Sequence, residues 1–301
     1  MENIIKLDTV DIFNKLWGFE TLNPLVTVVD MKKATKVPGS CTFNYGLYAL
    51  FLKQTKCGDI RYGRQTYDYQ EGTVTSFAPG QVIEVTRTPD VKPQALGLLF
   101  HPDLIKGTSL GQEIRNYSFF SYASNEALHL SEAEKGIFTD CLQKIEQELN
   151  HAIDKHSKRL IAKNIELLLD YCMRFYDRQF ITRQNVNSDV LTRFEALLHD
   201  YLHSDQALQN GLPSVRYFAD KVFLSPNYFG DLVKKETGKT AQEYIQNAIV
   251  DLAKEEIAHS DKTISQIAYE LGFQYSQHFS RLFKKATQVT PGEYRALARS
   301  N

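Results

Sequence analysis

The last hundred residues of the chain contain one helical pattern twice, and this internal repeat limits the possible folds more than any other feature. The sequence that begins at Ala219 aligns with the one that begins at Ala268 if the second copy is allowed one extra residue in its turn. Phe229 then falls on Phe279, and Lys-Lys and Thr residues further on also coincide. Two short helices joined by a short turn are a helix-turn-helix, so we predict two such units.

Residues that start helices support this division of each copy. In the first copy, Ser225 is placed to cap the second helix and Pro226 to take its first position. In the second copy, Gly272 predicts the turn and Ser276 the cap.

The second helix of the second copy has one apolar and one polar face. Its inward residues are predicted to be Phe279, Leu282, Phe283 and Ala286. Its outward residues are predicted to be Gln277, His278, Ser280, Arg281, Lys284 and Lys285. Glutamine and arginine can pair with base edges in the major groove, and lysine suits phosphates.

A merely solvated helix face is the alternative reading, and the duplication favours DNA over it. The residues from Thr240 to about His259 that join the two units would form a helix about 30 Å long, close to one turn of DNA. Two reading helices could therefore enter successive major grooves.

Charge is unevenly distributed along the chain. The 35 basic and 36 acidic residues nearly cancel. Residues 201–261 contain six basic and nine acidic residues, whereas residues 262–301 contain six basic and two acidic ones. Because phosphate contacts dominate affinity for DNA, we expect the second unit to hold DNA more firmly.

The part of the chain before the repeat has a different residue pattern. From about residue 24 to residue 100, short runs rich in Val, Thr, Tyr and Phe predict a small β-sandwich or barrel. Ser131 and Glu134 then form a predicted capping box. Apolar stripes from Phe138 to Leu149 and from Ile161 to Phe175 predict two helices in an antiparallel hairpin.

Residues 214–298 resemble the DNA-binding domain of the AraC/XylS family of bacterial transcription regulators. The segments "ISQIAYELGFQYSQHFSRLFKKATQVTPGEYR" and "FADKVFLSPNYFGDLVKKETGKTAQEYI" carry the resemblance. Upstream, "TVTSFAPGQ" and "LLFHPDLI" resemble more loosely the sensory portion of such regulators. The resemblance implies a domain of seven helices with two helix-turn-helix units, preceded by a cupin-like β-barrel with a helical dimerisation hairpin.

The expected fold is thus a multidomain α+β chain that ends in an all-α domain. The expected parts are a cupin-like effector-sensing barrel over residues 1–130, a dimerisation hairpin over 131–181, a polar linker over 182–190, and the DNA-binding domain over 191–301.

The outward faces and the resemblance together give the expected DNA-contacting residues. In the first unit they are Asn227, Tyr228, Gly230, Asp231, Lys234 and Lys235. In the second unit they are Gln274, Ser276, Gln277, His278, Ser280, Arg281, Lys284 and Lys285.

The expected function is that of a ligand-responsive, sequence-specific transcription regulator. Its expected partners are a double-stranded DNA operator, a second copy of the chain, a small organic effector and, for an activator, RNA polymerase. The alternative is a regulator without a small-molecule effector, either constitutive or controlled by a protein partner.

No effector-binding residue can be assigned from the sequence. The candidate lining residues are Tyr45, Tyr48, Arg61, Tyr62, Tyr67, Tyr69 and Phe77. Aromatic residues on strands are more often core residues or cross-strand pairs than ligand contacts.

We expect no enzymatic activity, cofactor or metal. No histidine precedes His101, so a metal in the barrel lacks its usual ligands. Residues 107–111, "GTSLG", match GxSxG but lack the strand before and helix after that a nucleophile elbow needs, so Ser109 is read as a loop residue. His199 and His203 stand one turn apart and could bind a metal, but a single pair without a nearby Cys favours a solvated helix face.

Cysteine spacing and hydropathy bear on the cellular compartment. Cys41, Cys57, Cys141 and Cys172 have no CxxC spacing, which favours reduced thiols. The N-terminus does not resemble a signal peptide, and no apolar run is long enough to span a bilayer. We therefore expect a cytoplasmic protein without a membrane partner.

Overall fold

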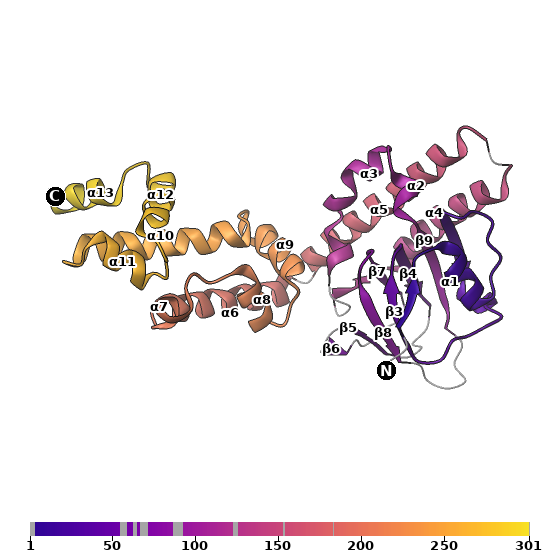
Figure 1. Ribbon diagram of the computed structural model, residues 1–301, viewed down its shortest axis with the longest axis horizontal. Coiled ribbons are helices and arrows are strands. Elements are labelled where there is room, and N and C mark those ends of the chain that lie inside the picture. Colours follow the sequence, from indigo (N-terminus) through magenta and orange to yellow (C-terminus); the bar gives the residue numbers. More distant parts are fainter. Residues whose placement is uncertain are drawn as a thin grey trace. The chain divides into compact units, whose positions relative to one another are not determined.

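The computed structural model describes residues 4–54, 59–62, 65–66, 72–86, 93–122, 126–152, 154–182 and 184–300 (Figure 1). The chain divides into two compact units, Met1–Thr182 and Arg183–Asn301, called unit 1 and unit 2 below. Unit 1 holds every described strand, and the described part of unit 2 is helical.

The described strands of unit 1 form two five-stranded sheets, in the orders β1-β3-β8-β5-β6 and β10-β7-β4-β9-β2. Among the described strand pairings, only that of β1 with β3 is parallel. The strands are β1 Ile4–Leu7, β2 Val26–Asp30, β3 Cys41–Tyr45, β4 Tyr48–Lys53, β5 Asp59–Tyr62, β6 Gln65–Thr66, β7 Thr73–Phe77, β8 Val82–Thr86, β9 Ala95–Phe100 and β10 Leu128–His129.

Apolar side chains of both sheets meet in one buried cluster. Phe43 of the first sheet and Leu99 of the second belong to it, together with Phe13 and Trp17 of helix α1 (Val10–Trp17). Alternating strand residues supply these inward side chains because successive side chains of a strand point to opposite faces.

The sheets do not close into the predicted cupin-like barrel in the part of the chain that the structure describes. Closure would require the edge strands of the two sheets to pair with each other. Edge strand β2 instead contacts helix α4 (Glu132–Asn150), and edge strand β10 contacts helix α5 (Ser157–Thr182). Covering an edge with a helix is an alternative to closing the sheet.

The aromatic candidates for an effector site lie within packed clusters where the structure describes them. Tyr45 and Phe77 are each 5% exposed, and their rings stack with centroids 5.0 Å apart. Tyr48 stacks on Phe100 at 5.1 Å. The other four candidates, Arg61, Tyr62, Tyr67 and Tyr69, and also Cys57, lie outside the residues whose side chains are described.

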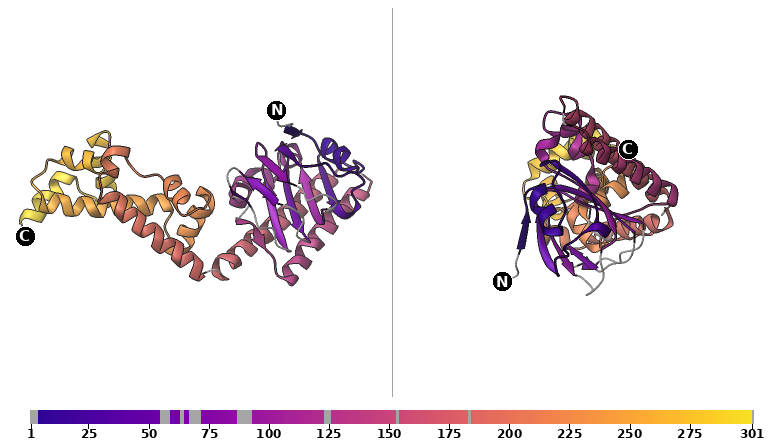
Figure 2. Two further views of the ribbon diagram at one scale, coloured as in Figure 1. Left: turned by 90° about the horizontal axis from the view of Figure 1, so that it is seen from below. Right: turned by 90° about the vertical axis from the view of Figure 1, so that its right-hand side faces the viewer.

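Helices α4 and α5 form the predicted hairpin and lie side by side in both Figure 1 and Figure 2. The capping box is present, since the Ser131 hydroxyl accepts from the Glu134 N–H and the Glu134 carboxylate accepts from the Ser131 N–H. The two apolar stripes are buried within a single chain, with Phe138, Ile165 and Leu168 each 0% exposed.

Four short helical segments lie between strand β9 and the hairpin in the described residues. Helix α2 spans Pro102–Ile105 and α3 spans Ser109–Glu113, and 3-10 turns follow at 114–116 and 118–121. Ser109 is therefore the first residue of a short helix and not a loop residue.

The described residues of unit 2 form eight helices, one more than the resemblance implies. They are α6 Gln184–Leu202, α7 Gln206–Asn210, α8 Val215–Lys221, α9 Pro226–Thr237, α10 Ala241–His259, α11 Ile264–Glu270, α12 Ser276–Thr287 and α13 Pro291–Ser300. Residues 184–190 lie in α6, although their polar composition led us to assign them to a linker. A polar segment without proline can continue a helix, because nothing in it interrupts the backbone hydrogen bonds.

Among the described helices of both units, no stretch has the length and apolar character that crossing a membrane requires.

Candidate nucleic-acid interface

Unit 2 contains two helix-turn-helix units, α8–α9 and α11–α12. The first turn places Phe223 at φ 62°, and the second places Gly272 at φ 90°. In both turns a backbone hydrogen bond returns to the preceding helix, from Leu224 N to Ala219 O and from Phe273 N to Ala268 O, each 3.0 Å long. The sequence repeat is thus also a repeat of backbone geometry.

Glycine is required in the second turn for two reasons. Gly272 adopts a left-handed backbone conformation that side chains disfavour. A Cβ atom at this position would lie 2.6 Å from the backbone carbon of Gly211. The turn therefore packs directly against the segment that follows α7.

A continuous apolar core fixes the reading helices α9 and α12. Phe229 of α9 and Phe279 and Phe283 of α12 are each 0% exposed and belong to one cluster with Ile249 and Ala253 of α10. Because the inward faces are anchored in this way, the opposite faces of α9 and α12 are held toward solvent. The predicted inward residue Ala286 is an exception, since it is exposed.

On α12 the structure brings the predicted polar residues to one exposed surface. The exposed members of the set are Gln274, just before the helix, and Gln277, His278, Arg281, Lys284 and Lys285 on it. Ser276 and Ser280 are partly buried, and the Ser280 hydroxyl donates to the Ser276 carbonyl over 3.0 Å.

Ser276 is not the helix cap that its position in the sequence suggested. The residue at the cap position of α12 is Tyr275, which makes no side-chain capping hydrogen bond. With Phe229 aligned on Phe279, Ser225 falls on Tyr275 and Pro226 on Ser276, so Ser276 is the first residue of the helix. In the first copy, Ser225 caps α9 as predicted by accepting from the Tyr228 N–H over 3.2 Å.

The first helix-turn-helix exposes fewer of its predicted DNA-contacting residues than the second does. Asn227, Lys234 and Lys235 are exposed, and Gly230 and Asp231 are partly buried. Tyr228 is only 4% exposed, so its side chain packs in the domain interior and is not placed to contact DNA. The aromatic character of Tyr228 alone did not distinguish a core residue from a DNA-contacting residue.

The lysines occupy the last turns of both reading helices. Lys234 and Lys235 lie in the last turn of α9, and Lys284 and Lys285 lie in the last turn of α12. Cations at a helix C-terminus interact favourably with the helix dipole, so these side chains stabilise their helices as well as attracting phosphate.

Two exposed aromatic residues extend the α12 surface and were missed in the sequence. Tyr275 is 62% exposed, with its ring 5.6 Å from that of His278, and Tyr269 at the end of α11 is 50% exposed. The alignment of Phe229 with Phe279 could have revealed Tyr275, because it places Tyr275 opposite Ser225, at the cap position of the second helix.

The described residues contain no group of three or more potential ligands that could hold a metal ion. His199 on α6 and His203, which directly follows α6, are exposed, and their rings stack with centroids 4.0 Å apart. The pair forms part of a solvated helix face.

A family model described as a helix-turn-helix domain matches residues 218–297. The Transposon Tn10 TetD protein of Escherichia coli is 35% identical over 144 residues, which are 48% of this chain and 91% of TetD. The HTH-type transcriptional activator RhaS of Citrobacter koseri is 27% identical over 158 residues, which are 51% of this chain and 54% of RhaS.

Among solved structures, an AraC-type transcriptional regulator of Chromobacterium violaceum aligns with 37% of this chain and 93% of its own, at 24% identity and a TM-score of 0.31. Several curated relatives are matched over only part of their length. The chain covers 11%, 55% and 27% of three of them.

The two helix-turn-helix units and the sequence matches define a helix-turn-helix transcription regulator. The chain belongs to the AraC/XylS family. Members of this family are regulators and not enzymes.

Proposed function

We propose that this protein recognises its operator mainly through α12, with α9 as a weaker second reader. The observation that carries the proposal is the exposed α12 surface, on which Gln277 and Arg281 lie one turn apart and lysines follow in the last turn. In a helix-turn-helix, the N-terminal part of the second helix contacts base edges. Gln277 and Arg281 lie in the first half of α12 and are therefore the proposed base-reading residues.

The remaining exposed residues take supporting roles in this proposal. Lys284 and Lys285 contact phosphates, and the first N–H groups of α12 are left without a side-chain cap and can also donate to a phosphate. Gln274, Ser276, His278 and Ser280 lie along the same helix start and line the groove walls. Asn227 and Lys234 are the corresponding contacts of α9.

We further propose that unit 1 is the regulatory part, which responds to a small organic effector and joins two copies of the chain. Because the aromatic candidates between the sheets pack against one another, the effector would have to bind elsewhere in unit 1. Because the predicted dimer seam is buried within one chain, the dimer would have to use another surface. Leu160 and Leu167 stand seven residues apart on α5 and are 46% and 39% exposed, so they are the proposed dimer contacts.

Selection from random double-stranded oligonucleotides tests the DNA-binding proposal. The purified chain should enrich a defined sequence, and its affinity should fall steeply as salt concentration rises, since counterions are released on binding. Enrichment of no sequence above background would contradict the assignment of α12 as a base reader.

A further inference from the structure

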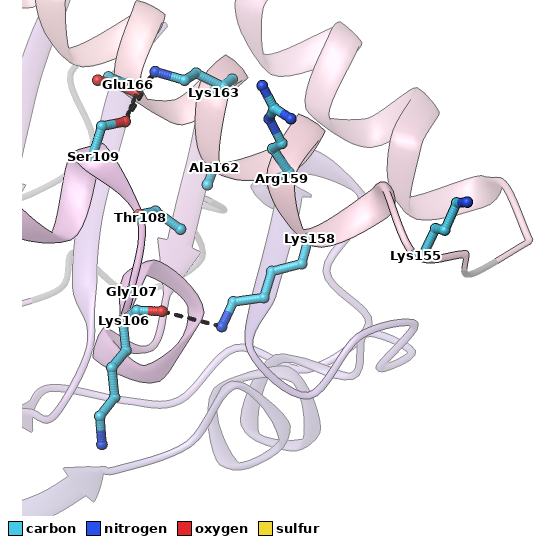
Figure 3. Close-up of a pocket in the computed structure, with 10 residues that line it drawn as sticks. All are labelled: Lys106, Gly107, Thr108, Ser109, Lys155, Lys158, Arg159, Ala162, Lys163 and Glu166. Carbon is cyan, nitrogen blue, oxygen red and sulfur yellow. Dashed lines mark hydrogen bonds and ion pairs between the residues drawn. The ribbon is translucent and has the colours of Figure 1, made fainter.

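A cationic pocket of about 440 Å³ lies wholly within unit 1, between the loop before α3 and the start of α5 (Figure 3). The volume is in the range of small-molecule sites, roughly 300–1,000 Å³. Five cationic side chains line it, namely Lys106, Lys155, Lys158, Arg159 and Lys163. Glu166 is the only carboxylate in the lining.

Lys163 and Glu166 neutralise each other at one end of the pocket. The Lys163 ammonium lies 2.8 Å from Glu166 Oε2 and donates to Ser109 Oγ over 2.9 Å, and Ser109 in turn donates to the same carboxylate. Burial alone would raise the pKa of Glu166, but the hydrogen bonds from Lys163 and Ser109 and the lysine charge hold it below its ordinary value. The Glu166 carboxylate is therefore ionised, and its charge is already balanced by that of Lys163.

The other four cations have no such partner. Lys158 reaches from α5 toward the loop, where its Nζ lies 3.4 Å from the uncharged carbonyls of Asp103 and Lys106. In the part of the chain that the structure describes, Lys106, Lys155 and Arg159 form no ion pair. Asp154 does not supply one, because its Oδ1 accepts from the N–H groups of His156 and Ser157 at the start of α5.

Four unmatched positive charges around one concavity repel one another, and an anion bound there would relieve this repulsion. A phosphate monoester suits these side chains better than a single carboxylate. It carries up to two charges and three acceptor oxygens, which can accept from several ammonium groups and from the arginine fork together. The volume leaves room for an organic group beside the phosphate.

We propose that this pocket binds a small organic phosphate ester and that the ester is the effector of unit 1. The second half of this inference rests on the regulatory role proposed above for unit 1. The first half, binding itself, does not depend on DNA recognition.

Isothermal titration of the full chain with glycerol 3-phosphate, inorganic phosphate and glycerol tests the binding. We expect saturable binding of both phosphates and none of glycerol. Replacing both Lys158 and Arg159 by Gln should weaken binding by at least about tenfold, and Arg159→Gln alone should weaken it less. Lys33→Gln is the matched control, an exposed lysine of unit 1 outside the pocket, and should bind like the wild type.

Three results would overturn the pocket assignment. The first is that neither phosphate binds, and the second is that Lys33→Gln weakens phosphate binding as much as the pocket variants do. The third is that Lys158 and Arg159 are needed only for binding DNA fragments or vesicles with anionic lipids. Binding without a change in operator affinity on addition of glycerol 3-phosphate would overturn the effector role alone. A chain that binds the ester but selects no DNA sequence would instead contradict the proposed function.

Discussion

At the residue scale, the two reading helices end on the same backbone conformation with different residues. Gly238 follows α9 at φ 73°, and Gln288 follows α12 at φ 67°. Both are exposed at the residue after the helix, where their N–H bonds to the carbonyl four residues earlier. A side chain in this left-handed region costs roughly 1–2 kcal/mol, so only the second helix carries the cost.

Exchanging these residue types should change the stability of unit 2 in opposite directions. Gln288→Gly should raise the free energy of unfolding by about 0.5–1 kcal/mol, because relief of strain exceeds the extra flexibility of glycine in the unfolded chain. Gly238→Ala should lower it by about 1 kcal/mol. Thermal unfolding followed by circular dichroism measures both, and a stabilised Gly238→Ala would contradict the account.

Residue patterns predicted which side chains are buried better than which side chains could contact DNA. Phe279 and Phe283 were correctly assigned to the core because apolar residues at helical spacing have few alternatives to burial. Tyr228 was not, because tyrosine suits both a core and an interface, and only the packing around α9 decides between them.

At the scale of elements, one ion pair ties the two helices of the hairpin together. The Arg178 guanidinium of α5 lies 2.7 Å from Glu134 Oε2 at the start of α4 and also donates to the carbonyl of His129. Burial alone would raise the pKa of Glu134, but the Ser131 N–H and Arg178 outweigh it and leave the pKa below the ordinary value of 4.5. The stabilisation is thus present above about pH 4.5 and is lost as the pH falls below it.

Glu134→Gln should therefore destabilise unit 1 by about 1–2 kcal/mol at pH 7 and by progressively less below pH 4.5. Denaturation followed by tryptophan fluorescence is selective for this unit, because the single tryptophan, Trp17, is buried there. Glu146→Gln is the control, since Glu146 lies on the same helix, is exposed and forms no ion pair within the described part of the chain. A difference between the wild type and Glu134→Gln that persists unchanged at pH 3 would exclude the proposed linkage.

Elements with local signals were predicted well, and relations between elements were not. The capping boxes and apolar stripes located α4 and α5 because the signal lies within each helix. Whether the strands close into a barrel depends on which edges pair, and the residues that cover those edges lie in helices α4 and α5, later in the chain. The cationic pocket also joins residues about 50 positions apart, and no local pattern marks it.

At the scale of the whole molecule, assembly should depend on the exposed residues of α5. In the proposed symmetric dimer, Leu167→Glu would place a charge in the contact twice, once for each copy, so dimer affinity should fall by at least about tenfold. Ile12→Glu is the control, because Ile12 is also 39% exposed but lies on α1. Light scattering at micromolar concentration checks this, and a wild-type monomer or an intact Leu167→Glu dimer would exclude α5 as the contact.

The central claim is that α12 reads the operator, while the more acidic first helix-turn-helix contributes little to operator recognition. It is tested most directly by titrating a selected operator, and single-base variants of it, with Arg281→Ala, Lys284→Ala and Asp231→Ala. Arg281→Ala should lose about 1–3 kcal/mol and its preference at one base pair, whereas Lys284→Ala should weaken all sequences alike and lower the salt slope by about one. Asp231→Ala should leave affinity unchanged or improve it, because a carboxylate facing DNA repels phosphate. A neutral Arg281→Ala together with loss of recognition in Asp231→Ala would contradict the account and make α9 the reader.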